Sequence, residues 1–186
     1  MFALAKIRCR AWIILCSMLL LPRVAAAFHL FFVPLTIPER GTIASCLVKT
    51  ETDQIRFLPP AGWRVDENSA LQKITMVATN LSTTIVWQIT PEVLSPEQWR
   101  ERVVLRFAAA RRLHDFDSYC AGQKCAAVEF ELVTPHTVLT KRLVFVPMNR
   151  EAIEIEFTAV GKLEDRTTIA FSNFLGSFQI EPLDRR

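Results

Sequence analysis

The chain has 186 residues, of which 51% are hydrophobic and 22% charged, and its formal net charge is +3. This composition is typical of a globular protein and excludes an intrinsically disordered chain. Residues 1–27 hold four basic residues and no acidic one, so residues 28–186 have 18 basic and 19 acidic residues and a net charge of −1. Such a balance gives no basic footprint, and we expect no nucleic-acid partner.

Residues 1–27 have the pattern of a secretory signal peptide. Three basic residues at positions 6, 8 and 10 precede an uncharged stretch over residues 11–21, and small residues end the segment at Ala25–Ala27. This order is typical of a cleaved leader, and the stretch is shorter than the roughly 20 apolar residues of a membrane-spanning helix. We therefore expect cleavage after Ala27 and an exported protein, periplasmic or elsewhere in a bacterial cell envelope. Because residues 28–37 are also apolar, an uncleaved N-terminal membrane anchor is the alternative, so membrane association stays open.

The pattern beyond the leader predicts one domain that is rich in strands. Residues 28–52 show no clear period and contain Pro34, Pro38 and Gly41, so we expect an extended lead-in before a single domain over residues 53–186. Alternating apolar and polar residues predict strands at residues 55–58, 63–65, 71–79, 83–89, 128–132, 138–146, 153–157 and 177–180. The strands over residues 71–79 and 83–89 are predicted to form a hairpin with its bend at residues 80–82. Residues 128–157 predict a meander whose outer strands place glutamates beside Lys141 and Arg142.

Two helices are expected among these strands. Ser95, Pro96 and Gln98 have the chemistry of a helix start with a capping box, and apolar residues at steps of three and four continue one helical face to Leu113. A second helix is expected over residues 163–175. The predicted fold class is therefore α+β, an antiparallel β-sheet flanked by two main helices. Its predicted core contains Trp63, Trp87, Trp99, Phe157 and Phe174.

Three cysteines follow the leader, at positions 46, 120 and 125. Cys120 and Cys125 flank a turn that contains glycine, which suits the short Cα separation of a disulfide, and an exported protein meets oxidising conditions. We predict a disulfide between them; two reduced cysteines, or a bridge from Cys46 to either, are the alternatives. Residues 43–46 also match the residue types of a lipoprotein cleavage box, but the polar segment 38–42 separates them from the leader, which makes lipidation of Cys46 the minor interpretation.

No catalytic, cofactor-binding or metal-binding residues are predicted. The chain has no G-x-S-x-G, P-loop or G-x-G-x-x-G motif, and no Cys or His pair has zinc-finger spacing. His114 lies beside Asp115 and Asp117, a group that suits a helix end better than a metal site. We expect no cofactor. The arginines of the first helix, represented by Arg102 and Arg106, are the candidate partner surface.

Two short segments resemble a known family. The segment Phe-Leu-Pro-Pro-Ala-Gly-Trp-Arg-Val over residues 57–65 resembles the early Pro-Gly-Trp segment of PsbP/DcrB/Mog-like proteins, and Phe-Leu-Gly-Ser-Phe over residues 174–178 resembles that family's closing segment. The resemblance implies a PsbP/Mog-like α/β/α sandwich over residues 53–181. It also implies a role as an extrinsic subunit, lipoprotein, chaperone-like adaptor or binding module. It implies no catalytic residue.

These observations support an exported, non-catalytic binding or adaptor module of the cell envelope that holds an envelope protein or an apolar segment. The alternative is a small exported enzyme whose site is assembled from distant residues and is invisible in the sequence. Between the sheet and its helices, a cleft lined by convergent polar or titratable groups would favour the enzyme, and an apolar groove would favour the module.

Overall fold

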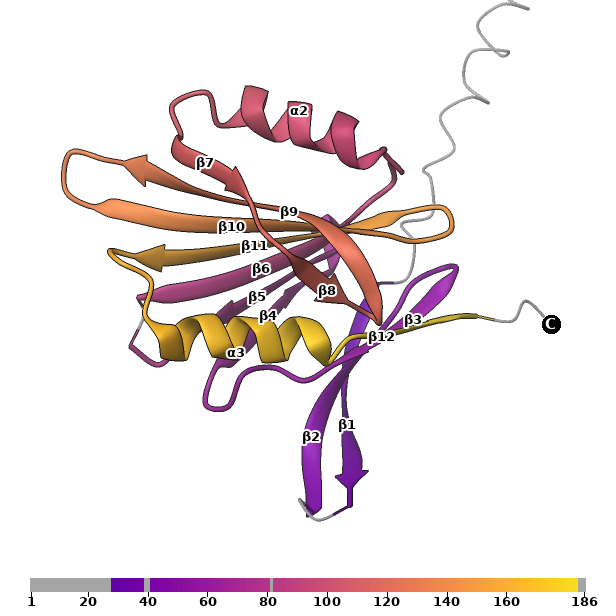
Figure 1. The fold of residues 1–186 in the computed structure, drawn as a ribbon. Coiled ribbons are helices and arrows are strands. Elements are labelled where there is room, and N and C mark those ends of the chain that lie inside the picture. Colours follow the sequence, from indigo (N-terminus) through magenta and orange to yellow (C-terminus); the bar gives the residue numbers. More distant parts are fainter. Residues whose placement is uncertain (1–27, 39–40, 81, 184–186) are drawn as a thin grey trace, which may run out of the picture.

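The computed structural model describes residues 28–38, 41–80 and 82–183 (Figure 1). The predicted signal peptide, residues 1–27, lies outside the described residues. The fold consists of two antiparallel sheets and two α-helices.

The larger sheet has eight strands in the order β4-β5-β6-β11-β10-β9-β7, with β8 paired to β9. Its strands are β4 (Arg64–Asn68), β5 (Lys73–Val77), β6 (Thr83–Thr90), β7 (Arg111–Asp115), β8 (Ser118–Cys120), β9 (Gln123–Val133), β10 (Val138–Pro147) and β11 (Ala152–Val160). The predicted hairpin, β5–β6, and the predicted meander, β9–β10–β11, are confirmed. In the meander, Arg142 pairs with Glu129 and Lys141 with Glu156, so the expected charge pairing across the strands is also confirmed.

The smaller sheet has four strands in the order β1-β2-β3-β12. These are β1 (His29–Ile37), β2 (Gly41–Lys49), β3 (Asp53–Phe57) and β12 (Gln179–Pro182). Residues 28–52, expected as an extended lead-in, thus form a hairpin of two nine-residue strands. Segments far apart in the sequence meet here: Leu58 N donates to Ser177 Oγ at 2.9 Å, across 119 positions of sequence.

Two helices and one short 3-10 helix, η1 (Ser69–Leu71), complete the described fold. α2 (Pro96–Arg106) begins with the predicted capping box, in which the Ser95 and Gln98 side chains each bond the other's backbone N–H. It ends at Arg106 instead of Leu113, because Phe107 leaves the helical conformation with φ −118° and ψ 49° and the chain then enters β7 at Arg111. Leu113 nevertheless packs beneath α2, which explains why its spacing resembled a continued helix. The second helix, α3 (Asp165–Gly176), lies close to its predicted position.

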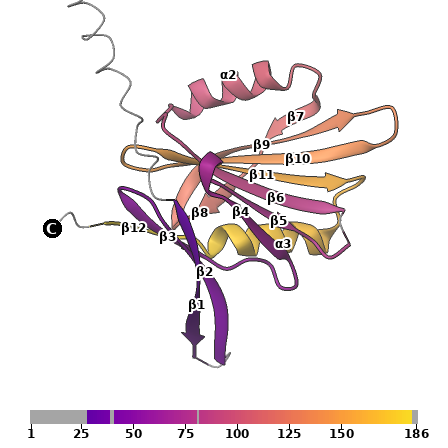
Figure 2. The same cartoon turned by 180° about the vertical axis from the view of Figure 1, so that it is seen from behind.

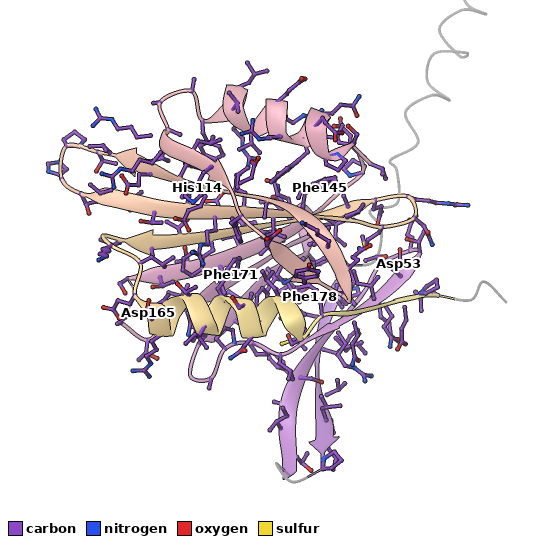
Figure 3. The ribbon with its side chains drawn as sticks, viewed as in Figure 1. Asp53, His114, Phe145, Asp165, Phe171 and Phe178 are labelled. Carbon is purple, nitrogen blue, oxygen red and sulfur yellow. The ribbon has the colours of Figure 1, made fainter. Side chains whose placement is uncertain are left out.

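Two hydrophobic cores lie on opposite faces of the larger sheet (Figure 3). The main core lies among both sheets and α3, and its aromatic residues include Phe57, Trp87, Phe157, Phe171, Phe174 and Phe178. The second core lies between α2 and β9–β11, where the Trp99 ring stacks on Phe145 with centroids 5.6 Å apart. Trp87, Trp99, Phe157 and Phe174 are fully buried as predicted, whereas Trp63 is only partly buried at the edge of the main core.

The predicted fold class is wrong. The protein is mostly β, with sheets of four and eight strands and helices of only 11 and 12 residues, and it is not a helix-flanked α/β/α sandwich. The local patterns place most strands correctly, but they do not show that β1, β2, β3 and β12 form a second sheet. The smaller sheet and α3 together cover part of one face of the larger sheet. An α/β/α sandwich would have only helices on that face.

Candidate functional site

The β1–β2 hairpin carries an apolar surface on one side. In its register Phe31 lies opposite Leu47, Val33 opposite Ser45, and Leu35 opposite Ile43. Because alternate residues of a strand share a face, four apolar side chains line the same side of the hairpin. We call this surface the outer hairpin face and define it by Phe31, Val33, Leu35 and Ile43. Phe31 is 46% exposed, and the other three are partly exposed.

The opposite side of the hairpin has a different character. At its base, Cys46 and Val48 are fully buried in the main core, which anchors the hairpin. Further along this side, Phe32 lies opposite Cys46 and is 62% exposed, and nearer the tip the Thr36 and Thr42 hydroxyls lie 3.2 Å apart as a hydrogen-bonded pair. Figures 1 and 2 show from both sides that the distal half extends away from the rest of the fold. The β1–β2 hairpin is therefore an arm that is anchored at its base and carries the outer hairpin face.

The free edge of this arm is poorly suited to pairing with another strand. β1 is the edge strand of the smaller sheet, and Pro34 lies in its middle, opposite Ala44. Proline has no N–H to donate, and prolines on edge strands are a common protection against edge-to-edge association. The side chains of the outer hairpin face, and not the backbone of its edge, are thus what the arm offers to a partner.

Two cations lie at the base of the same face. Arg56 pairs in register with Leu47, and Lys49 lies two positions further along β2, so both belong to the side that carries Phe31. Lys49 is exposed, and Arg56 Nε is buried without a hydrogen-bond partner. Neither residue makes an ion pair with any described residue. Among the described residues of the smaller sheet, Glu181 of β12 is an acidic residue on this side, opposite Gln54.

A second candidate is a cleft of about 920 Å³ between β7, β9, β10 and the start of α3. We call it the charged cleft. Its charged lining residues are Arg112, Glu129, Glu131, Arg142, Lys162 and Asp165. Figure 3 shows His114 near the β7 end of this region and Asp165 at the start of α3.

Most polar groups of the charged cleft are bonded to one another. Arg142 pairs with Glu129, Arg112 Nη1 lies 2.9 Å from Glu131 Oε1, and His114 Nε2 lies 3.7 Å from Glu129 Oε1. The hydroxyl of Thr140 donates to Gly161 O at 2.9 Å. A ligand that bound to these paired groups would first have to break the bonds between them. The free energy lost with each broken bond offsets part of the free energy gained on binding.

The arginines proposed as a partner surface are also engaged within the chain. Arg102 pairs with Glu92, and Arg106 Nη1 lies 2.7 Å from Glu154 Oε1 while its guanidinium lies over the Phe107 ring at 4.7 Å. The role of Arg102 and Arg106 stays a prediction. Their charges are locally neutralised, which weakens their attraction for a distant partner.

The residues around His114 are likewise used locally. Asp115 accepts from Arg100 at 2.8 Å, Asp117 from Lys124 at 2.7 Å, and His114 Nδ1 lies 2.9 Å from Arg112 O. Hydrogen bonding to Lys124 lowers the pKa of Asp117. Within residues 28–183 as described, no three His, Cys, Asp or Glu side chains converge as metal ligands.

The predicted disulfide between Cys120 and Cys125 is not formed, and the described cysteines are all reduced. The register explains the error: Ala121 and Gly122, both with positive φ, make a two-residue turn that places Cys120 opposite Gln123, whereas Cys125 lies opposite Ser118. The cysteines are therefore diagonal neighbours and do not face each other. Burial raises the pKa of both thiols, and raises the pKa of Cys46 to about 11. Cys46 is fully buried within β2, which does not fit its lipidation.

Sequence reasoning missed the outer hairpin face. The available signal was the pair of uncharged runs at residues 28–37 and 41–48, separated by a short Pro-Glu-Arg segment that ends at Gly41. For the first run, the sequence predicts an extended lead-in or the extension of a membrane anchor, and not a strand of a hairpin. Its apolar residues occur on both phases of the strand, so the alternation that indicates a half-buried strand is missing.

Comparisons with known proteins identify no family for this chain. No family model matches the sequence, and no curated protein does. Among solved structures, the chain is similar to LpqN, described as involved in cell envelope biogenesis of Mycobacterium tuberculosis, with 16% identity, a TM-score of 0.49, and coverage of 83% of this chain and 92% of LpqN. The likeness at this level gives no family membership or function, and the PsbP/DcrB/Mog-like resemblance is not confirmed. No helix of the described residues has the length and apolar character to span a membrane.

Proposed function

We propose that the protein is an exported, non-catalytic binding module of the cell envelope, and that it holds an apolar partner on the outer hairpin face. One observation carries the proposal: Phe31, Val33, Leu35 and Ile43 lie next to one another, exposed or partly exposed, on one side of a hairpin that extends from the fold. Contiguous exposed apolar surfaces of this kind mark interaction sites more often than isolated exposed residues do.

The energetics of the arm support binding. Covering apolar surface contributes roughly 25 cal/mol for each Å² removed from water. Leu35 and Ile43 face each other across the hairpin and Phe31 lies nearer the base, so one partner surface can cover all three at once. The buried base of β2 holds the arm in place before binding, which reduces the conformational entropy that the complex must lose.

A small exported enzyme remains the second candidate, and the charged cleft is the observation that favours it. The cleft is lined by convergent titratable groups, which is common at active sites. Its arginines and glutamates are paired with each other, and the Thr140 and Thr168 hydroxyls donate to backbone carbonyls. These internal bonds favour a structural role for the groups, and we rank the binding module first.

Site-specific photo-crosslinking tests the proposal. A photoreactive phenylalanine analogue is placed at Leu35 and, as a matched control, at Leu105, an α2 residue that is 79% exposed and lies far from the hairpin. We expect a crosslinked product from the native envelope at position 35, and a much lower yield at position 105. The Phe31→Ser change should reduce the yield at position 35.

Equal yields at the two positions, or no product at position 35, would contradict the outer hairpin face as a binding surface. Turnover of a substrate by the purified protein, lost on Glu129→Gln with the fold retained, would instead favour the enzyme. These two results are independent of each other.

A further inference from the structure

We infer that the partner of the outer hairpin face is the surface of an anionic lipid bilayer, on which the smaller sheet docks side-on. This inference rests on the proposed function and adds the chemistry of the partner. It uses the outer hairpin face together with Lys49 and Arg56, which lie beside it on the same side of the sheet.

The arrangement has the two chemical parts that a lipid interface recognises. Leu35 and Ile43 lie at one end of this side, whereas Lys49 lies opposite His29, six residues along β1 from Leu35. At the rise of a strand this separation is about 20 Å. Apolar side chains and cations therefore lie on one side of the sheet, the combination found on peripheral proteins that lie in the membrane interface and do not cross it.

The cations fit an anionic surface in particular. Lys49 and Arg56 make no ion pair with described residues, in contrast to the arginines of α2, so their charges are not neutralised locally. Glu181 lies on the same side but on the far strand β12, and the three charges together leave this surface positive. Lysine and arginine near an anionic leaflet strengthen adsorption, and their aliphatic stems can pack along the apolar surface.

The backbone of the arm also favours lipid over a strand-pairing protein. Pro34 interrupts the donors along β1, so a partner strand would lose a hydrogen bond in the middle of the edge. Side-on docking needs no such pairing. It also leaves the unpaired edge groups of the arm at the interface, where water and headgroups satisfy them, whereas insertion into the hydrocarbon would leave them unsatisfied.

Co-sedimentation of the purified protein with vesicles tests the inference. We expect binding to mixed phosphatidylglycerol–phosphatidylcholine vesicles, much weaker binding to pure phosphatidylcholine, and a loss of affinity as salt is added. Lys49→Gln and Arg56→Gln should each weaken binding roughly fivefold. Phe31→Ser should weaken it roughly tenfold, because a large apolar contact is lost.

Two variants serve as controls. Phe32→Ser changes the neighbouring aromatic residue, which is 62% exposed on the opposite side of the arm. Arg111→Gln removes an exposed cation of β7 that makes no ion pair with described residues. Both should bind mixed vesicles as the wild type does.

The outcomes separate this inference from the proposed function. Absence of vesicle binding, together with a crosslink from position 35 to a protein, would overturn the lipid inference and leave the binding module intact. Absence of both would overturn both. Equal losses for Phe31→Ser and Phe32→Ser would contradict the side-on orientation, and equal binding to neutral and anionic vesicles would exclude the role of Lys49 and Arg56.

Discussion

β11 and β1 are both nine-residue strands rich in apolar residues, but the fold uses them in opposite ways. β11 lies between β6 and β10, and Ile153, Ile155 and Phe157 are fully buried. β1 has one neighbour, and its adjacent residues Phe31 and Phe32 are 46% and 62% exposed. The difference teaches that apolar side chains on β11 stabilise the fold, whereas those on distal β1 remain available for a partner.

The β1–β2 hairpin shows the same contrast within one element. Its base contributes Cys46 and Val48 to the main core, while Val33, Leu35 and Ile43 further along stay partly exposed. A base held by the core and an apolar distal half are what a docking arm requires. Four predictions test the division between folding and binding residues.

The largest effect is expected at β11. Phe157 is fully buried, and its ring lies 4.8 Å from that of Phe171 in α3. Phe157→Ala should lower the free energy of unfolding by about 3–5 kcal/mol, because it leaves a cavity in the main core. Denaturant unfolding measures the change, with the exposed Phe32→Ala as the control. An equal loss of unfolding free energy in Phe157→Ala and Phe32→Ala would contradict the distinction between a buried β11 and an exposed β1.

The sequence predicts the β11 side of this comparison well. Ile153, Ile155 and Phe157 alternate with two glutamates, and Val128, Phe130 and Leu132 do the same on β9. Alternation arises where one face of a strand is buried and the other is not, and connections of a few residues make sequential strands pair. The capping box of α2 is equally local, since Ser95 and Gln98 are three residues apart.

The β1 side could not be predicted in the same way. The smaller sheet depends on β3 pairing with β12, and Ile55 opposite Ile180 is a contact between segments far apart in the sequence that no local pattern specifies. The sequence of β1 lacks alternation because both of its sides carry apolar residues, as the neighbours Phe31 and Phe32 show. The position of Arg56 beside the outer hairpin face follows only from its register with Leu47, which the sequence does not show. The candidate site was therefore visible as composition but not as a surface.

A smaller effect is expected from the cap of α2, which covers the meander and not the hairpin. The Ser95 hydroxyl accepts from Gln98 N at 3.2 Å. Ser95→Ala should lower the free energy of unfolding by about 1 kcal/mol, because a helix N–H loses its acceptor. Vesicle binding should not change, because the cap is remote from the hairpin. Reduced binding at unchanged stability would indicate that α2 belongs to the partner surface, as its arginines suggested.

The junction between the two sheets should respond to pH. Burial, together with Asp53 and Glu51, raises the pKa of the Glu151 carboxyl above its usual 4.5. The folded state therefore binds this proton more tightly than the unfolded state, so its contribution to stability is full below the usual pKa and is lost as pH rises through the raised one. Glu151→Gln should remove this loss and raise stability at neutral pH by less than about 1 kcal/mol, since the carboxyl is partly exposed to solvent. Unfolding midpoints at acidic and neutral pH measure the difference, and a variant that is less stable at neutral pH would contradict it.

The smallest effect on stability is expected at the outer hairpin face, where the comparison between β11 and β1 is sharpest. Phe31 lies on an edge strand and is 46% exposed, so Phe31→Ser should change the free energy of unfolding by no more than about 0.5 kcal/mol. The same variant should lose binding to anionic vesicles, whereas Phe157→Ala should retain that binding wherever it remains folded. Unfolding and co-sedimentation on the same protein samples give both values. A strongly destabilised Phe31→Ser variant would show that the Phe31 side chain stabilises the fold. The β1–β2 hairpin would then belong to the core and would not be a binding surface.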